Sequence, residues 1–224
     1  MSKIEMLQQR SLSGLRGSLL VALQAYRATT HVDISSTVAQ AKYGKITFQK
    51  LTAPDLSILV EWLNRPHVAE WWDACESLEE VREKYLPRMR DESTVVPYLA
   101  YLDSTPIGYI QSYVAAATSD GWWPNEHDPE VRGIDQFLAD EQHLGQGLGT
   151  QMVKDFVQFL FRDPKVTKIQ ADPALTNARA IRCYEKAGFR RVGPITTPDG
   201  PAMLMVIDCV RVPDETYSQG ANRP

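Results

Sequence analysis

The stretch 142–149, Gln-His-Leu-Gly-Gln-Gly-Leu-Gly, constrains the fold of this chain more than any other. It follows an apolar run at 131–138 that predicts a strand, and it precedes residues 150–161, whose apolar positions repeat at helical spacing. Glycines bring a ligand close to the backbone, and the first turn of a helix leaves its N–H groups without partners. We therefore predict a ligand that carries phosphate or pyrophosphate. A plain turn that only joins strand to helix is the alternative.

The glycine spacing excludes two common phosphate loops. Gly145, Gly147 and Gly149 read G-x-G-x-G. Dinucleotide-binding folds use G-x-G-x-x-G, and P-loop NTPases need Gly-Lys followed by Ser or Thr. Gln142, with Gly145 and Gly147, instead fills the pattern Q-x-x-G-x-G/A. Farther along the chain, residues 177–189 read N-x-x-A-x-x-x-Y-x-x-x-G-F, so two separate patterns follow one another.

Together the two patterns resemble those of the GCN5-related N-acetyltransferases, the GNAT superfamily, over about residues 45–210. The resemblance implies an α/β (α+β) fold with a mixed, mostly antiparallel central sheet, splayed parallel strands and flanking helices. It also implies acetyl-CoA as co-substrate and no metal. The positions that it assigns to acetyl-CoA binding are Ile134, Gln136, Phe137, Gln142, Leu144, Gly145, Gln146, Gly147, Leu148, Gly149, Thr150, Asn177 and Tyr184.

Within that set the resemblance implies distinct roles. The backbone of residues 134–137 pairs with the pantetheine amides, and the loop 144–150 holds the pyrophosphate. Asn177 hydrogen-bonds the pantetheine arm, and Tyr184 protonates the departing thiolate. Helical periodicity alone favours a packing role for Tyr184, and the surrounding pattern reverses that preference.

The rest of the chain fits an α/β arrangement. Alternation and β-branched or aromatic residues predict strands at 45–51, 97–102, 107–116, 131–138, 167–171, 189–192 and 202–210. Capping residues and helical spacing predict helices after Thr52, from Ser77 to near Pro87, at 150–161 and at 177–187. A hairpin turn at 103–106 and a polar loop at 118–129 complete the pattern.

Length and charge limit the class of protein. With 224 residues we expect one catalytic domain at 43–212, a partly helical or poorly ordered extension at 1–42 and a flexible tail at 213–224. The net charge of −4 does not suggest binding to nucleic acid, and it is compatible with a cationic small substrate. We expect a monomer or weak dimer.

Targeting and metal signals are weak. The apolar run at 18–25 is too short to span a bilayer and has no clean cleavage site, so we expect a cytoplasmic protein with no membrane contact. The three cysteines are widely spaced, which predicts buried reduced thiols and neither a disulfide framework nor a metal site. The four histidines form no pair with ligand spacing.

A closer resemblance, to the aminoglycoside 6′-N-acetyltransferases of the resistance type, rests on five short segments. These are Asn-Arg at 64–65 with Glu-Trp-Trp at 70–72, Asp-Gly-Trp-Trp at 120–123, 131–136 and 196–201. It implies transfer of acetyl to the 6′-amine of kanamycin- and tobramycin-like antibiotics. Leu138 lies where the family separates amikacin from gentamicin, and we favour amikacin.

Three aspartates are the candidate ligands of a polycationic substrate. An Asp inside a strand is disfavoured by propensity, so Asp135 is the strongest candidate, and the resemblance assigns it as general base. Asp120 would anchor the aminosugar. Asp199, in Pro-Asp-Gly, is equally well explained as a turn residue. Each lone Asp has such a structural alternative.

The paired tryptophans are candidates for stacking on sugar rings, although paired aromatics also fill cores. We expect one member of each pair at the pocket, with Trp71, Trp72 and Trp122 as candidates and Trp123 as the fourth aromatic. Two other functions share the acetyl-CoA residues: a GNAT that acetylates protein N-termini or polyamines, and a non-catalytic CoA-binding module.

Overall fold

The computed structural model describes residues 43–118 and 121–210, and the statements below concern these residues. The expected extension at 1–42, the expected tail at 213–224 and Asp120 lie outside the described residues. Within the described part of the chain, none of the helices combines the length and the apolarity needed to cross a bilayer.

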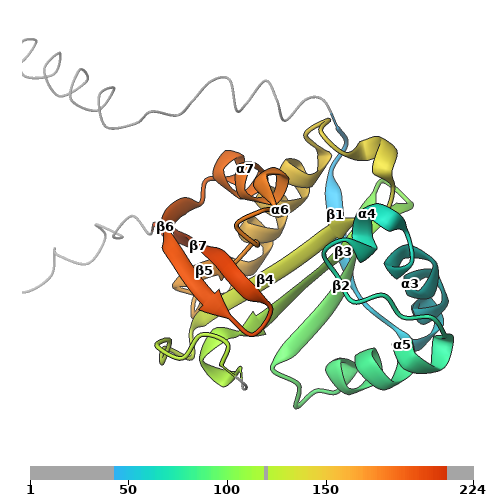
Figure 1. Ribbon diagram of the computed structural model, residues 1–224, viewed down its shortest axis with the longest axis horizontal. Helices are drawn as coiled ribbons and strands as arrows, with labels where there is room; N and C mark the ends of the chain where they lie inside the picture. Colours follow the sequence, from blue (N-terminus) through green and yellow to red (C-terminus); the bar gives the residue numbers. More distant parts are fainter. Residues whose placement is uncertain (1–42, 119–120, 211–224) are drawn as a thin grey trace, which may run out of the picture. The chain divides into compact units, whose positions relative to one another are not determined.

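The described residues form one mixed sheet with helices on both faces (Figure 1). The strands are β1 Ile46–Lys50, β2 Val95–Leu102, β3 Thr105–Val114, β4 Val131–Leu138, β5 Lys168–Ala171, β6 Arg190–Thr197 and β7 Gly200–Asp208. The α-helices are α3 Leu56–Leu63, α4 Pro66–Ala69, α5 Leu78–Tyr85, α6 Leu148–Leu160 and α7 Ala178–Ala187. Short 3-10 turns are η1 Ala53–Asp55, η2 Leu86–Met89, η3 Ala115–Ala117 and η4 Glu141–His143.

The sheet order is β1-β2-β3-β4-β5-β7-β6, and the pair β4–β5 is parallel while the other pairs are antiparallel. The parallel ladder covers only 131–133 of β4 against 168–170 of β5. Beyond Gly133 the two strands diverge, while β4 stays paired with β3 up to Leu138. This splayed pair confirms the expected fold class.

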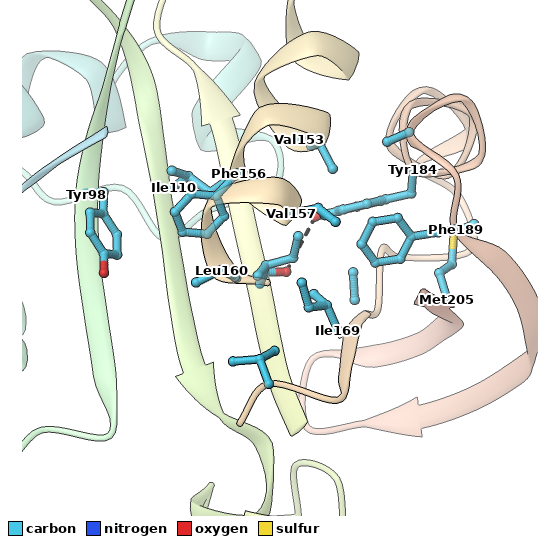
Figure 2. Close-up of a cluster of buried hydrophobic side chains, with 14 of the residues drawn as sticks. Tyr98, Ile110, Val153, Phe156, Val157, Leu160, Ile169, Tyr184, Phe189 and Met205 are labelled. Carbon is cyan, nitrogen blue, oxygen red and sulfur yellow. Dashed lines mark hydrogen bonds between the residues drawn. The ribbon is translucent and has the colours of Figure 1, made fainter. Parts of the chain in front are cut away.

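Alternation along the strands divides the buried side chains between the two faces of the sheet. Ile110 and Ile134 belong to a cluster with Phe156 of α6 and Tyr184 of α7 (Figure 2). Their strand neighbours on the opposite face join a cluster with the α3 and α5 side chains. Because successive strand residues point to opposite faces, one face holds the α6–α7 layer and the other the α3–α5 layer.

Element boundaries differ from the sequence prediction mainly at β6 and α6. The prediction ended the sixth strand at 192, but β6 continues to Thr197 and forms a hairpin with β7. Pro194 is tolerated within this longer strand because β6 pairs on one side only, as an edge strand does. Helix α6 begins at Leu148, two residues before the expected start, because Gly147 serves as its N-cap.

The cysteines are free, as expected for the described chain. Only Cys75 is buried, however, while Cys183 and Cys209 are half-buried. Cys183 lies on α7, with its sulfur 3.7 Å from the hydroxyl of Thr150. Its partial exposure reflects its position beside the cleft described next.

Candidate active site

A cleft of about 1120 Å³ opens where β4 and β5 diverge. Single drug-sized ligands usually occupy roughly 300–1,000 Å³, so this cleft has room for two substrates side by side. Its walls come from α4 and the chain after it, β3, β4, the glycine loop, α7 and the β6–β7 turn.

One edge of β4 is available to a ligand. From Ile134 to Leu138 the strand pairs with β3 on one side, and among the described strands none pairs with its other side. Tyr184 lies along this edge, with its hydroxyl 3.5 Å from the carbonyl oxygen of Ile134 (Figure 2). Backbone amides and carbonyls at such an edge bind an extended chain of amides as a further strand would.

The glycine loop has the geometry of an anion site. Gly145 and Gly147 have φ of 72° and 94°, which side-chain-bearing residues rarely adopt. A Cβ placed at either position would meet nothing within 4 Å, so the space beside both is open. Gly147 is also the N-cap of α6, whose first N–H groups therefore face that space. The hydroxyl of Tyr43 donates to the Gln146 carbonyl at 2.8 Å and fixes the loop from outside.

The expected acetyl-CoA residues divide into two groups. Those that line the cleft are Gln136, Phe137, Leu144, Gly145, Gly147, Gly149, Thr150, Asn177 and Tyr184. The side chains of Ile134 and Leu148 are buried in the two cores on the α6 face, so only their backbone can serve a ligand. Gln142 and Gln146 do not line the cleft either, and the Gln146 amide donates to the Gln142 carbonyl at 2.6 Å.

Asn177 has a structural task in addition to its expected one. Its Oδ1 accepts from the backbone N–H of Ala180 at 2.9 Å and caps α7. Asn177 also lines the cleft, and its side-chain amide carries two N–H donors that the cap does not use. The same residue can therefore start the helix and donate to a ligand.

Asp135 lies on β4 with its side chain on the cleft face. Gln111, its cross-strand partner on β3, donates its amide N–H to Asp135 Oδ2 at 2.8 Å. Burial raises the pKa of Asp135 to about 6, the Gln111 hydrogen bond and the charge of Arg88 lower it, and the charge of Asp199 raises it. A carboxylate with a pKa near 6 is mostly ionised at neutral pH and still accepts a proton readily.

Asp172 is a cleft residue that the sequence did not reveal. It directly follows β5, so it lies across the gap from β4. Burial, together with the nearby charges of Asp135 and Asp199, raises its pKa to about 8. The sequence signal for Asp172 was its position at the end of a strand that neighbours β4. That strand has only four residues, so the signal was weak.

Asp199 lies in the β6–β7 turn, as its Pro-Asp-Gly context predicts, and it also lines the cleft. It is exposed, whereas Asp135 and Asp172 are half-buried. The turn and the site assignments for Asp199 are thus compatible. Asp120 is not placed by the described residues.

All four paired tryptophans border the cleft, whereas the sequence had assigned one of each pair to it. Trp71 is 38% exposed, while Trp72 packs edge-on against Tyr109 and Phe137. Trp123 has a φ of 50° and donates its indole N–H to the Tyr113 hydroxyl at 3.3 Å. Aromatic walls of this kind suit the apolar faces of sugar rings.

Tyr184 is buried at 4% exposure, and its ring packs edge-on against Phe189. Burial raises its pKa well above the usual range, and the negative charge of Asp135 raises it further. The hydroxyl therefore keeps its proton at neutral pH. It lies at the open edge of β4 and can donate a hydrogen bond there.

Among the described residues, no group of three or more His, Cys, Asp or Glu side chains is arranged to hold a metal ion.

Comparison with known proteins identifies the family. Residues 52–197 match the family model "Acetyltransferase (GNAT) domain". The chain belongs to the GNAT acetyltransferase family. An aminoglycoside N(6′)-acetyltransferase type 1 from Klebsiella pneumoniae is 56% identical over 164 residues, which are 72% of this chain and 82% of that relative. The resemblance stated from the sequence motifs is confirmed.

Solved structures of acetyltransferases share the fold. The aminoglycoside acetyltransferase AAC(6′)-Ib in complex with coenzyme A and kanamycin is 55% identical, with a TM-score of 0.70. That match covers 73% of this chain and 95% of the other. The complex of the same enzyme with paromomycin and acetyl-CoA is 56% identical over 73% and 93% of the two chains, also with a TM-score of 0.70.

Proposed function

We propose that this GNAT is an aminoglycoside 6′-N-acetyltransferase that transfers acetyl from acetyl-CoA to the 6′-amine of antibiotics such as kanamycin, tobramycin and amikacin. One observation carries the proposal. A cleft lined by Asp135, Asp172 and Asp199 meets the open edge of β4 and the glycine loop. Relatives and solved structures named for this activity, at 55–56% identity, support it.

Acetyl-CoA would bind through the backbone. The open edge of β4 suits the two amides of pantetheine, and the N-terminus of α6 suits the pyrophosphate. Asn177 would donate to the pantetheine arm. This arrangement places the thioester beside Tyr184 and Asp135, which border the same stretch of β4.

The aminoglycoside would bind through charge and stacking. Its ammonium groups meet the carboxylates of Asp135, Asp172 and Asp199, with Asp120 proposed as a further anchor. Trp71, Trp72 and Trp122 would contact the sugar rings. Because neutral Asp172 must ionise to pair with an ammonium, binding releases a proton at neutral pH.

Proton balance defines the chemistry. Asp135 takes one proton from the 6′-ammonium, directly or through water, and frees the nitrogen lone pair. The nitrogen attacks the thioester carbonyl carbon, a C–N bond forms, and the C–S bond then breaks. Tyr184 gives its hydroxyl proton to the thiolate sulfur, and the second proton lost by nitrogen restores Tyr184 through solvent. Asp135 then releases its proton to solvent, so the products are the amide, CoA thiol and one proton.

Orientation would supply much of the rate. Holding amine and thioester in reacting geometry can lower the activation barrier by roughly 7–11 kcal/mol in favourable cases. General-base catalysis can raise the rate by about 10²–10⁴-fold. A backbone N–H on the open edge of β4 would polarise the thioester carbonyl. The chemistry requires no metal from the protein.

The rival activities keep the same acetyl-CoA residues. A GNAT for protein N-termini or polyamines would use the β4 edge and the glycine loop equally well. The three carboxylates and four tryptophans of the cleft favour a bulky polycationic sugar over a peptide. A non-catalytic CoA-binding module would have no use for a Tyr184 hydroxyl at the strand edge.

A thiol-release assay tests the proposal. We expect CoA thiol production with kanamycin, tobramycin and amikacin, and little with gentamicin, a peptide panel or spermine. Mass spectrometry should place one acetyl on the 6′-nitrogen, and expression in a susceptible bacterium should raise the inhibitory concentration of kanamycin. Turnover of peptides without turnover of kanamycin would refute the proposal. We further propose a cytoplasmic monomer or weak dimer.

A further inference from the structure

We infer that Gln111 is a positioning residue, which holds the Asp135 carboxylate in one orientation and relays to it the positive charge of Arg88. The inference rests on the proposed role of Asp135 as general base. Gln111 is 8% exposed and was not suggested by any sequence motif.

The hydrogen bonds fix which way the Gln111 amide faces. Its Oε1 accepts from the Tyr109 hydroxyl at 2.8 Å and from the Arg88 guanidinium at 3.0 Å. With two donors at the oxygen, the amide nitrogen must face Asp135, and it donates to Oδ2 at 2.8 Å. In the reverse orientation, the two donors from Tyr109 and Arg88 would face the NH₂ group. The amide oxygen of Gln111 would then face the Asp135 carboxylate.

Packing keeps the amide in place. Gln111 and Asp135 are direct cross-strand partners. The next cross-strand residue pair on each side with its side chains on the same face contributes an aromatic ring. On one side Tyr109 stacks on Phe137 with centroids 5.4 Å apart. On the other side the Tyr113 ring occupies the space over Gly133, where a Cβ would lie 2.1 Å from a ring carbon. Rings therefore flank the amide on both sides along the strands.

The relay explains why a guanidinium borders an acidic cleft. Arg88 lies on η2, stacks 4.9 Å from the centre of the Tyr85 ring, and is absent from the ion pairs found in the described part of the chain. A direct Arg–Asp pair would hold the carboxylate strongly ionised and occupy the face that must receive the amine proton. An interposed amide occupies one carboxylate oxygen and leaves the other free.

Several other groups act on the same carboxylate. The charged or titratable side chains around Asp135 are Arg88, Tyr109, Tyr113, Asp172, Tyr184 and Asp199. Burial, Asp199 and Asp172 favour the protonated acid, and the Gln111 hydrogen bond and Arg88 oppose them. Removing the amide therefore moves the balance toward the protonated, inactive form.

The test is the pH profile of kcat/KM for kanamycin. Because a base must be ionised, activity rises with pH through the pKa of Asp135. In Gln111→Met we expect this acid limb to move to higher pH, with about a tenfold loss near pH 5.5 and a much smaller loss at pH 8.5. Tyr109→Phe, which removes only a hydroxyl, should move the limb less and in the same direction.

Gln170→Met is the matched control. Gln170 is another buried glutamine of the sheet, at 3% exposure, and its amide nitrogen has no hydrogen-bond partner. We expect its acid limb to stay at the wild-type pH. A loss in Gln111→Met that is uniform across pH, or equal to that of Gln170→Met, would show a merely structural role.

A double-mutant cycle separates this inference from the proposed function. If Gln111 acts through Asp135, then Gln111→Met adds no loss in an Asp135→Asn background. A full additional loss there overturns the relay alone. Wild-type turnover by Asp135→Asn would instead overturn the proposed base, and the relay with it.

Discussion

The two halves of the cleft are built on different principles. The half proposed for acetyl-CoA consists mainly of consecutive backbone: the edge of β4, the loop 140–147 and the first turn of α6. The half proposed for the acceptor consists of side chains from β3, β4, the end of β5 and the β6–β7 turn. Recognition by the backbone requires glycines at close spacing, which form a local sequence pattern. An acidic cleft formed by side chains from distant segments has no such local pattern. Substitutions should therefore separate the two halves.

The largest expected effect is on the acceptor half. Asp135→Asn keeps the shape and the Gln111 contact region but cannot accept a proton, so turnover should fall about 10²–10⁴-fold. Acetyl-CoA affinity, measured by calorimetry, should stay within about twofold because the β4 backbone is unchanged. A large loss of acetyl-CoA binding would mean that the halves are not separable.

Tyr184 lies where the acetyl-CoA half and the acceptor half of the cleft meet, and Tyr184→Phe tests its role. The change removes the proton donor at the β4 edge and leaves the ring packed on Phe189. We expect the chemical step to slow by about 10–100-fold. Single-turnover kinetics would measure this step directly. An acyl donor with a better thiolate leaving group should recover part of the rate, and the absence of such recovery would argue against a proton-donor role.

Gly147→Ala addresses the acetyl-CoA half alone. Its φ of 94° is unfavourable for any residue with a Cβ, although the space beside it is open. The conformational cost of about 1–2 kcal/mol should weaken acetyl-CoA binding roughly tenfold and leave kanamycin affinity unchanged.

Gly149→Ala is the companion variant for stability. Gly149 lies inside α6, where a Cβ would make only ordinary contacts with Leu138 and Cys183, the nearest at 3.5 Å. Alanine there should raise thermal stability, since glycine costs about 1 kcal/mol within a helix. Equal stability of the two variants would contradict the conformational argument for Gly147.

The smallest effect should be a gain in stability. The folded pKa of Asp172, about 8, lies above the ordinary value of 3.8 for an aspartate, so the folded state holds its proton more tightly. The stability from this neutral acid is fully present below about pH 4 and is lost as pH rises to about 8. Asp172→Asn should therefore raise the Tm of the free enzyme by about 2–5 °C at pH 8, with no gain near pH 4.

The same variant should weaken kanamycin binding, because a permanently neutral amide cannot pair with an ammonium. Calorimetry in buffers of different ionisation enthalpy would also show a smaller proton release on binding than in the wild type. A gain in Tm that does not depend on pH would refute the assigned pKa of Asp172.

The contrast between backbone recognition and side chains from distant segments also explains which site residues the sequence predicted. The loop glycines, Asn177 and Tyr184 occur in two compact patterns, and the structure places them in one cleft, whereas Gln142 of the first pattern does not line it. Asp135 stood out because a strand rarely contains an Asp. Asp172 and Gln111 escaped notice, since neither breaks a local rule. Gln111 acquires its role only from Asp135, 24 residues away, and from Arg88, 23 residues away.

The sequence by itself determined the family and the order of strands and helices along the chain, and it predicted the acetyl-CoA half, because each depends on spacing within about a dozen residues. Tertiary structure alone decided which carboxylates face one another and how the Asp135 carboxyl is held. It also decided that Asp172 is neutral and Asp135 largely ionised at neutral pH. Burial and the distances between charges set these properties, and neither exists until β3, β4, β5 and the β6–β7 turn come together.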